Sequence, residues 1–168
     1  MIRRTHLIVI GASWLALFLG ACSREPLTGP PVVRVGRDQC AECGMLISED
    51  RFCSGMLVDD AGRRTYVLFD DVGCMLDLER EGLAGRSVLE RYVRDHATKE
   101  WVKAESARFL LADPQAFPTP MGTGIASFAS PDAAARAQST YPGQVLDYPG
   151  LAAARQAWTE ARRNRPGG

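Results

Sequence analysis

An apolar run close to the N-terminus decides how much of this chain can fold into a domain. Arg3 and Arg4 form a short basic region, and residues 7–21, LIVIGASWLALFLGA, carry no charge. A helix needs ~20 residues to cross a bilayer core of ~30 Å, so this run is too short to span a membrane. Its length and its basic flank are typical of a secretory signal peptide. We therefore predict that residues 1–21 are a signal peptide and exclude them from the fold.

The end of this run predicts an anchor. Leu19, Gly20 and Ala21 precede Cys22, and this order resembles a bacterial lipobox, in which small residues lead to a cysteine modified with diacylglycerol. A multiply acylated cysteine binds a membrane firmly, because each buried CH₂ contributes about 0.8 kcal/mol. We therefore predict lipid attachment at Cys22 and a location on the periplasmic side of a bacterial cell membrane. Ser23 is not the aspartate that retains enteric lipoproteins at the inner membrane, which gives a slight preference for the outer membrane.

The rest of the chain has the size of one small domain. Removal of the signal peptide leaves 147 of the 168 residues, a common length for a single domain. The full chain balances 20 Lys+Arg against 20 Asp+Glu, and the loss of Arg3 and Arg4 leaves 18 against 20, a net charge of −2. Neither a basic block nor interleaved basic and aromatic residues are present, so we expect no nucleic-acid partner.

Composition divides the mature chain into three parts. Residues 22–37 contain three prolines and two glycines, which fits a flexible tether between the lipid and the domain. Residues 38–150 hold the strand and helix patterns of the domain itself. Residues 151–168 predict a C-terminal helix followed by a basic tail.

The order of strand and helix patterns predicts an α+β fold with antiparallel hairpins. Apolar and alternating runs predict strands at 52–58, 64–69, 88–93, 107–112, 125–129 and 144–148. A turn signal at 59–62 makes the first two strands a hairpin. Asp70 or Asp71 can cap a helix that ends near Glu81, and Ser130 followed by Pro131 starts another. The third helix is predicted at 151–163, and no sequence repeat is visible.

The cysteines leave three interpretations open. With Cys22 assigned to lipid, Cys40, Cys43, Cys53 and Cys74 remain in an oxidising compartment, where two disulfides are one option. A thiol-disulfide oxidoreductase using Cys40 and Cys43 is a second. Such a pair usually begins a helix after a buried strand, whereas here Gly44 follows directly and no strand pattern precedes, which disfavours this option.

A structural zinc site is the third interpretation. One Cys-x-x-Cys pair supplies half of a four-ligand site, and the other half usually has similar spacing. The candidates are Cys53, Cys74 and His96, each isolated in the sequence. Cys53 lies in an apolar strand pattern and is expected to be buried. His96 lies among charged residues and is expected to be exposed.

The methionines favour a softer metal. Met45 follows the cysteine pair, Met75 follows Cys74, and Met121 lies between a proline and a glycine in a loop without apolar periodicity. Met56 and Met75 also fit a role in the core. Thiolate and thioether sulfur together are ligands that Cu(I) prefers. Thioethers also resist disulfide formation, which suits a copper site in an oxidising space.

Several motifs in one order give the sequence a resemblance to a known family. A lipobox is followed by DQCAECGMLIS at 38–48, FDDVGCM at 69–75, YVRDHATKEWVKAESARFLL at 92–111 and TPMGTGIASFAS at 119–130. Together these motifs resemble the NosL family, whose members are lipoprotein copper chaperones encoded with nitrous oxide reductase. The resemblance covers most of the mature chain.

This resemblance implies a function and a fold. The implied function is Cu(I) binding in the periplasm, without catalysis, and delivery towards the copper centres of nitrous oxide reductase with help from a membrane ABC-type complex. The implied fold is α+β with two related ββα-type units, similar to the treble-clef-like fold of organomercurial-lyase relatives.

The resemblance also implies metal ligands. Cys43 and Met45 match the CGM motif of the family, and Met121 matches its PMG loop. Cys40 matches a position that is often cysteine in the family. Cys74 and Met75 match the segment after the two aspartates, which implies structural support or a second metal contact. Cu(I) is therefore the expected metal.

Overall fold

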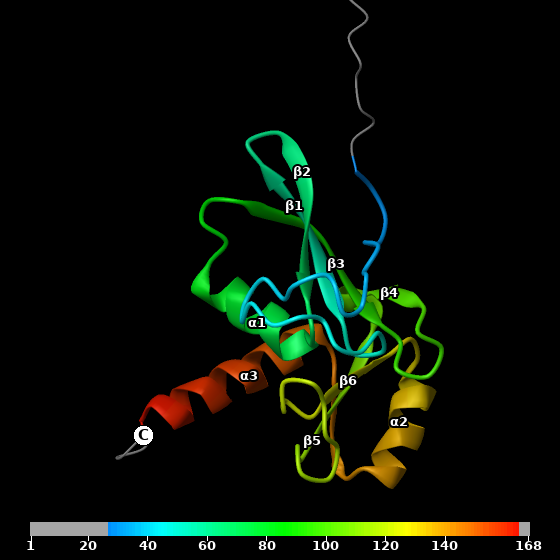
Figure 1. The fold of residues 1–168 in the computed structure, drawn as a ribbon. Coiled ribbons are helices and arrows are strands. Elements are labelled where there is room, and N and C mark those ends of the chain that lie inside the picture. The colour runs from blue at the N-terminus through cyan, green and yellow to red at the C-terminus, as the bar shows by residue number, and fades with distance from the viewer. Residues whose placement is uncertain (1–26, 165–168) are drawn as a thin grey trace, which may run out of the picture.

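The structure, a computed structural model, describes residues 27–164. The predicted signal peptide at 1–21 and the predicted lipid site at Cys22 lie outside the described residues. Among the helices of 27–164, none has the length and apolar character needed to cross a bilayer. Figure 1 shows two small sheets, with three helices packed around them.

The first unit is a four-stranded antiparallel sheet with one helix. The elements follow in the order β1 (Ser54–Asp60), β2 (Arg63–Phe69), α1 (Val72–Glu81), β3 (Ser87–Arg94) and β4 (Trp101–Lys103). Their order in the sheet is β2-β1-β3-β4. The hairpin turn forms where the sequence predicted it, with Ala61 and Gly62 both at positive φ.

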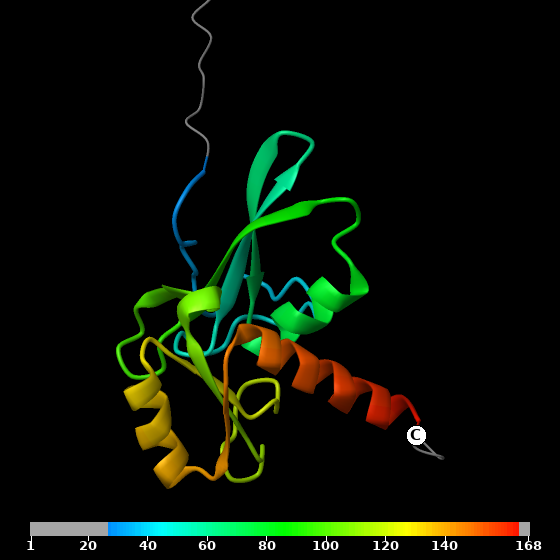
Figure 2. The same ribbon diagram turned by 180° about the vertical axis from the view of Figure 1, so that it is seen from behind.

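The second unit repeats this connectivity. It contains β5 (Arg108–Ala112), β6 (Ile125–Phe128), α2 (Pro131–Thr140), β7 (Gly143–Leu146) and α3 (Tyr148–Arg163), after a short 3₁₀ helix at Ala104–Ser106. The sheet order is β6-β5-β7, so the first strand again lies between its hairpin partner and the strand after the helix. Figures 1 and 2 show α2 and α3 on opposite sides of this sheet. The predicted α+β fold with two ββα-type units is confirmed.

Two local predictions were wrong. The strand predicted at 144–148 ends at Leu146, because the Asp147 side chain accepts a hydrogen bond from the Gly150 N–H and starts α3 at Tyr148. The third helix therefore begins three residues earlier than predicted. The short strand β4 was missed, because its three residues are too few to show a period.

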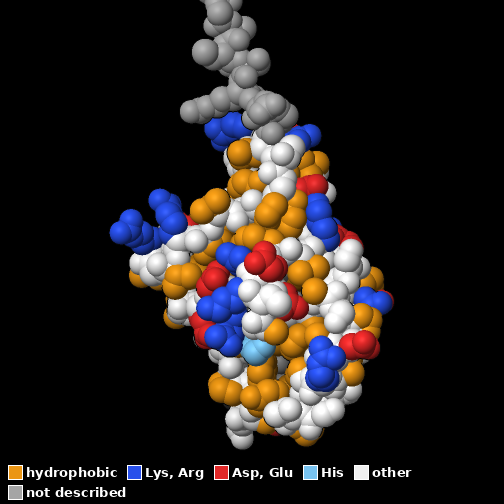
Figure 3. All heavy atoms as spheres, turned by 90° about the vertical axis from the view of Figure 1, so that its right-hand side faces the viewer, with side chains coloured by type: hydrophobic (Ala, Val, Ile, Leu, Met, Phe, Trp, Pro, Cys, Tyr) orange, Lys and Arg blue, Asp and Glu red, His pale blue; other side chains and the backbone are white. Residues whose placement is uncertain are grey.

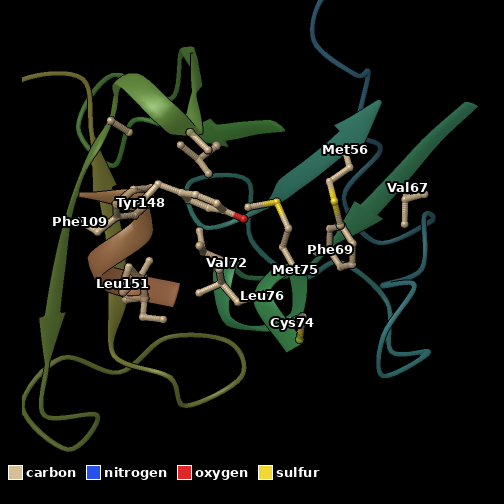
Figure 4. Packing of buried hydrophobic residues seen from close by; sticks show 14 of the residues in the cluster. Met56, Val67, Phe69, Val72, Cys74, Met75, Leu76, Phe109, Tyr148 and Leu151 are labelled. Atoms are coloured by element: carbon tan, nitrogen blue, oxygen red, sulfur yellow. The ribbon is translucent and has the colours of Figure 1, made fainter. Parts of the chain in front are cut away.

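The main core lies between the two units. α1 and α3 contact each other there, and Asp77 on α1 pairs with Arg155 on α3 at 2.6 Å. Tyr148 packs against Phe109 and donates a hydrogen bond of 2.6 Å to Glu79. Figure 4 shows the other buried residues of this core, which include Met56, Phe69, Val72, Met75, Leu76 and Leu151. The two units therefore share one apolar interior.

The described part of the predicted tether contacts the first sheet. The Tyr66 hydroxyl donates to the carbonyl oxygens of Thr28 and Gly29 at 3.0 and 2.8 Å. Pro31 is buried, and a Cβ added at Gly55 would lie 2.8 Å from its Cγ. In Figure 1 this segment runs beside the β1–β2 hairpin. Residues 27–31 thus cover part of the sheet.

Candidate metal centre

The Cys40–Cys43 pair lies in a tight turn. The Cys40 N–H donates to the Met45 carbonyl at 2.8 Å, and the Gly44 N–H donates to the Cys40 carbonyl at 2.9 Å. Gly44 has φ +75, a conformation that glycine adopts without a steric penalty. No helix begins at this pair, which confirms the expectation that argued against a thioredoxin-type arrangement.

Two contacts dock this turn onto the end of β2. The Ala41 N–H donates to the Leu68 carbonyl at 2.9 Å. The Asp70 carboxylate is 1% exposed and accepts hydrogen bonds from the N–H and the hydroxyl of Ser48 at 2.7 and 3.1 Å. A buried carboxylate without partners would be costly, so these bonds fix both the side chain and the loop. Asp70 therefore supports the site by holding residues 38–48 in place.

Four side chains converge where this loop meets α1. Cys40, Glu42, Cys43 and Cys74 each offer a ligand atom, and these atoms all lie within 4.8 Å of one another. Cys40 and Cys74 are buried, whereas Cys43 and Glu42 are partly exposed. All the cysteines of residues 27–164 are free thiols, so the two-disulfide interpretation is not the one this structure adopts. The group has one buried side and one open edge.

Sequence reasoning found this group incompletely. The motifs predict Cys40 and Cys43 as ligands and Cys74 as support or a second metal contact, because Cys74 is isolated in the sequence. The hairpin returns the chain so that the first turn of α1 lies beside the loop, which brings Cys74 to the pair. Glu42 was missed, although its position inside the Cys-x-x-Cys motif is a usable signal.

The three thiols differ in protonation. A hydrogen bond with the Cys74 thiol lowers the pKa of Cys40 to about 5, even though Cys40 is buried. The same hydrogen bond, together with burial, raises the pKa of Cys74. Burial also raises the pKa of Cys43 and of the Glu42 carboxyl. The Cys40 thiol is therefore the most acidic of the three, and the thiols must lose their protons before all three sulfurs can bind a cation.

The methionines named from the sequence lie in three different settings. Met45, two residues after Cys43, is 56% exposed. Met121 is partly buried and packs against the main core. Met75 is fully buried, and Figure 4 shows it on a different side of α1 from Cys74. Met75 is therefore part of the core in this structure, as is Met56.

Cys53 and His96 lie away from the thiol group. The Cys53 thiol is buried as expected and donates to the Asp50 carbonyl at 3.1 Å, and burial raises its pKa to about 11.

His96 was predicted to be exposed, and that prediction was wrong. Its ring lies 5.3, 5.5 and 5.8 Å from the rings of Phe52, Phe117 and Phe128, and burial lowers its pKa. The residue is half-buried because its backbone N–H donates to the Ser127 carbonyl, a hydrogen bond that holds His96 next to the second unit. Figure 3 shows this face, with apolar side chains on one side of the histidine and basic side chains on the other.

Comparison with known proteins identifies the family. The family model NosL matches residues 31–154. The chain belongs to the NosL family. Among solved structures, it is similar to the copper chaperone NosL from Shewanella denitrificans, with a TM-score of 0.61 and 21% sequence identity over 74% of this chain and 96% of that chain. This similarity shows that the two proteins share a fold. No curated protein matches the sequence.

Proposed function

We propose that this NosL-family protein is a membrane-anchored periplasmic metallochaperone that binds Cu(I) and supplies it for the maturation of nitrous oxide reductase. The observation that carries the proposal is the convergence of Cys40, Cys43 and Cys74, from a loop and a helix, within 4.8 Å. Thiolates neutralise the charge of Cu(I) and match its softness. Membership of a family that includes a copper chaperone of known structure supports the same conclusion.

The exposure of the ligands suits delivery. The buried thiols Cys40 and Cys74 would retain the ion, while Cys43 and the exposed thioether of Met45 lie where a partner can reach them. Met121 would add a ligand from the second unit. A site of mixed thiolate and thioether ligands can pass its ion to an acceptor by ligand exchange, with no bond of the protein chain made or broken. The protein then acts as a carrier and not as an enzyme.

The proposed anchor and partners follow the sequence motifs. Lipid at Cys22 would hold the domain at the periplasmic side of the membrane, near a membrane ABC-type complex and the reductase. Replacement of Cys22 by serine should yield a protein without acyl chains and with poor signal processing. Membrane fractionation and mass spectrometry measure both. An acylated species in Cys22→Ser equal to that of the wild type would remove the lipobox interpretation.

Metal competition tests the main proposal. The reduced soluble domain, titrated against a Cu(I) chelator and a Zn(II) chelator, should retain Cu(I) far more tightly than Zn(II). X-ray absorption of the copper form should report sulfur ligands. Comparable retention of zinc, with four sulfur, nitrogen or oxygen ligands, would favour the structural-zinc alternative. Disulfide reductase activity that depends on Cys40 and Cys43, in a protein that binds no copper, would favour the oxidoreductase.

A further inference from the structure

The carboxylate of Asp71 joins the two units next to the candidate metal centre. Asp71 caps α1, where one of its oxygens accepts from the Gly73 N–H at 2.5 Å. Its other oxygen accepts from the hydroxyls of Thr123 and Thr119 at 2.6 and 3.2 Å. The Asp71 side chain is fully buried, so bulk water cannot take the place of either threonine hydroxyl as its hydrogen-bond donor. One carboxylate thus holds a helix of the first unit and a loop of the second.

The loop that Asp71 holds is the one that carries Met121. The Thr119 hydroxyl also accepts from the N–H groups of Thr123 and Gly124 at 3.0 and 3.2 Å. The Gly122 N–H donates to the Thr119 carbonyl at 2.9 Å, which closes a turn with Met121 at its third position. The turn is therefore folded around Thr119, and Thr119 is bound to Asp71.

The helical turn that Asp71 caps is the one that carries Cys74. Gly73 packs so closely on the loop that an added Cβ would lie 2.5 Å from the Thr123 Cγ2. The two segments are thus in van der Waals contact, with the carboxylate beside the contact. A side-chain oxygen is enough to cap a helix. A second oxygen, which a serine or threonine cap lacks, is what reaches the loop.

We propose that Asp71 is a positioning residue for copper binding, which sets the place of Met121 relative to the thiols by holding residues 119–124 against the first turn of α1. This inference rests on the proposed function, because it requires Met121 to be a ligand. Asp71 itself does not touch the metal. Its two partner threonines determine whether the second unit contributes to the site.

A double-mutant cycle tests this role. Thr123→Val removes the hydroxyl that donates to Asp71 and keeps the shape of the side chain. We expect it to weaken Cu(I) binding about tenfold in a chelator competition, within the range for coupled residues. In a Met121→Leu background, the same change should have no further effect, because the ligand that it positions is already absent. X-ray absorption should show one fewer sulfur ligand in Thr123→Val.

Two controls separate positioning from general destabilisation. Ser130→Ala removes the hydroxyl that caps α2 through the Ala133 N–H, away from the thiols, and should leave Cu(I) affinity unchanged. Asp71→Asn keeps the side-chain size and one acceptor oxygen. If Thr123→Val does not fold, Asp71→Asn replaces it in the double-mutant cycle with Met121→Leu. Melting of each apo variant checks that affinities are measured on folded protein.

The outcomes are distinct. Equal weakening by Thr123→Val with and without Met121 would show that Asp71 acts on the fold and not on this ligand, and would overturn the inference. Wild-type affinity in Thr123→Val or in Met121→Leu alone would also overturn it, while the proposed chaperone would stand on its thiols. Absence of Cu(I) binding by the wild-type protein would overturn the proposed function itself.

Discussion

The two units share a connectivity and differ in chemistry. In each, a hairpin leads through an N-cap residue into a helix, and the strand after the helix pairs with the first strand. The N-cap is Asp71 before α1 and Ser130 before α2. Three residues further on, the first unit has Cys74 and the second has Ala133. Equivalent places in the fold therefore hold a thiol in one unit and a methyl group in the other.

The difference shows what the shared topology does not supply. Both N-caps satisfy a backbone N–H of their helix, so both stabilise it. The first unit also has the loop at 38–48, docked by Asp70, which brings two more thiols to the helix. The helix of the second unit instead packs Ala134 into a small core with Phe52, Phe117 and Phe128. The candidate site is thus a property of a few side chains and one added loop.

The largest expected effect comes from removing a thiol of the group. Cys43→Ser should lower Cu(I) affinity at least about 100-fold, beyond the loss expected for a supporting residue, because a serine hydroxyl stays protonated and is a hard ligand. Chelator competition measures this. Cys53→Ser is the matched control, since Cys53 lies outside the group, and it should bind Cu(I) as the wild type does. Similar losses in both variants would mean that thiol loss acts through the fold.

The next effect contrasts the two N-caps in stability. Asp71→Ala should lower the free energy of unfolding by about 2–4 kcal/mol, because it removes the cap and also the buried acceptor of the Thr119 and Thr123 hydroxyls. Ser130→Ala should cost about 1 kcal/mol, the loss of a cap alone. Chemical denaturation of both apo variants checks the order. Equal losses would contradict the view that Asp71 joins the units.

The fold was largely predictable because its signals are local. The turn at 59–62, the cap at Asp71 and the Ser130–Pro131 helix start each depend on neighbouring residues, and all three form as expected. The failure at 144–148 is also local. Its apolar alternation is real, but Asp147 and Pro149 begin a helix that overrides it.

The site was less predictable because its contacts are long-range. The motif at 38–48 indicated soft-metal chemistry, and it gave two of the thiols. The third thiol, Cys74, joins them only through the docking of the loop onto the end of β2. The setting of His96 depends in the same way on a contact with Ser127, which no local pattern encodes.

A smaller effect is expected from His96 as pH changes. Burial lowers its pKa in the folded protein, so below a pH of about 6.5 the unfolded chain binds more protons at this residue than the folded one does. Its contribution to stability is present above that pH and is lost as pH falls below it and through the lowered pKa of the folded protein. His96→Phe should therefore show a weaker pH dependence of unfolding in this range than the wild type. If the free energy of unfolding depends on pH equally in His96→Phe and in the wild type, His96 has the same pKa in the folded and unfolded states.

The smallest expected effect on stability comes from Met45, an exposed residue of the loop at 38–48. Leucine has a similar volume, and a volume-conserving swap costs under ~1.5 kcal/mol even in a core. Because 56% of the Met45 surface is exposed, Met45→Leu should lower the free energy of unfolding by much less than that. The variant should therefore melt like the wild type without copper. Its Cu(I) affinity should nevertheless fall, because the thioether is lost. Met56→Leu, inside the core, is the control that should change melting and not affinity. Unchanged affinity in Met45→Leu would remove Met45 from the ligand set and leave copper to the three thiols and Met121.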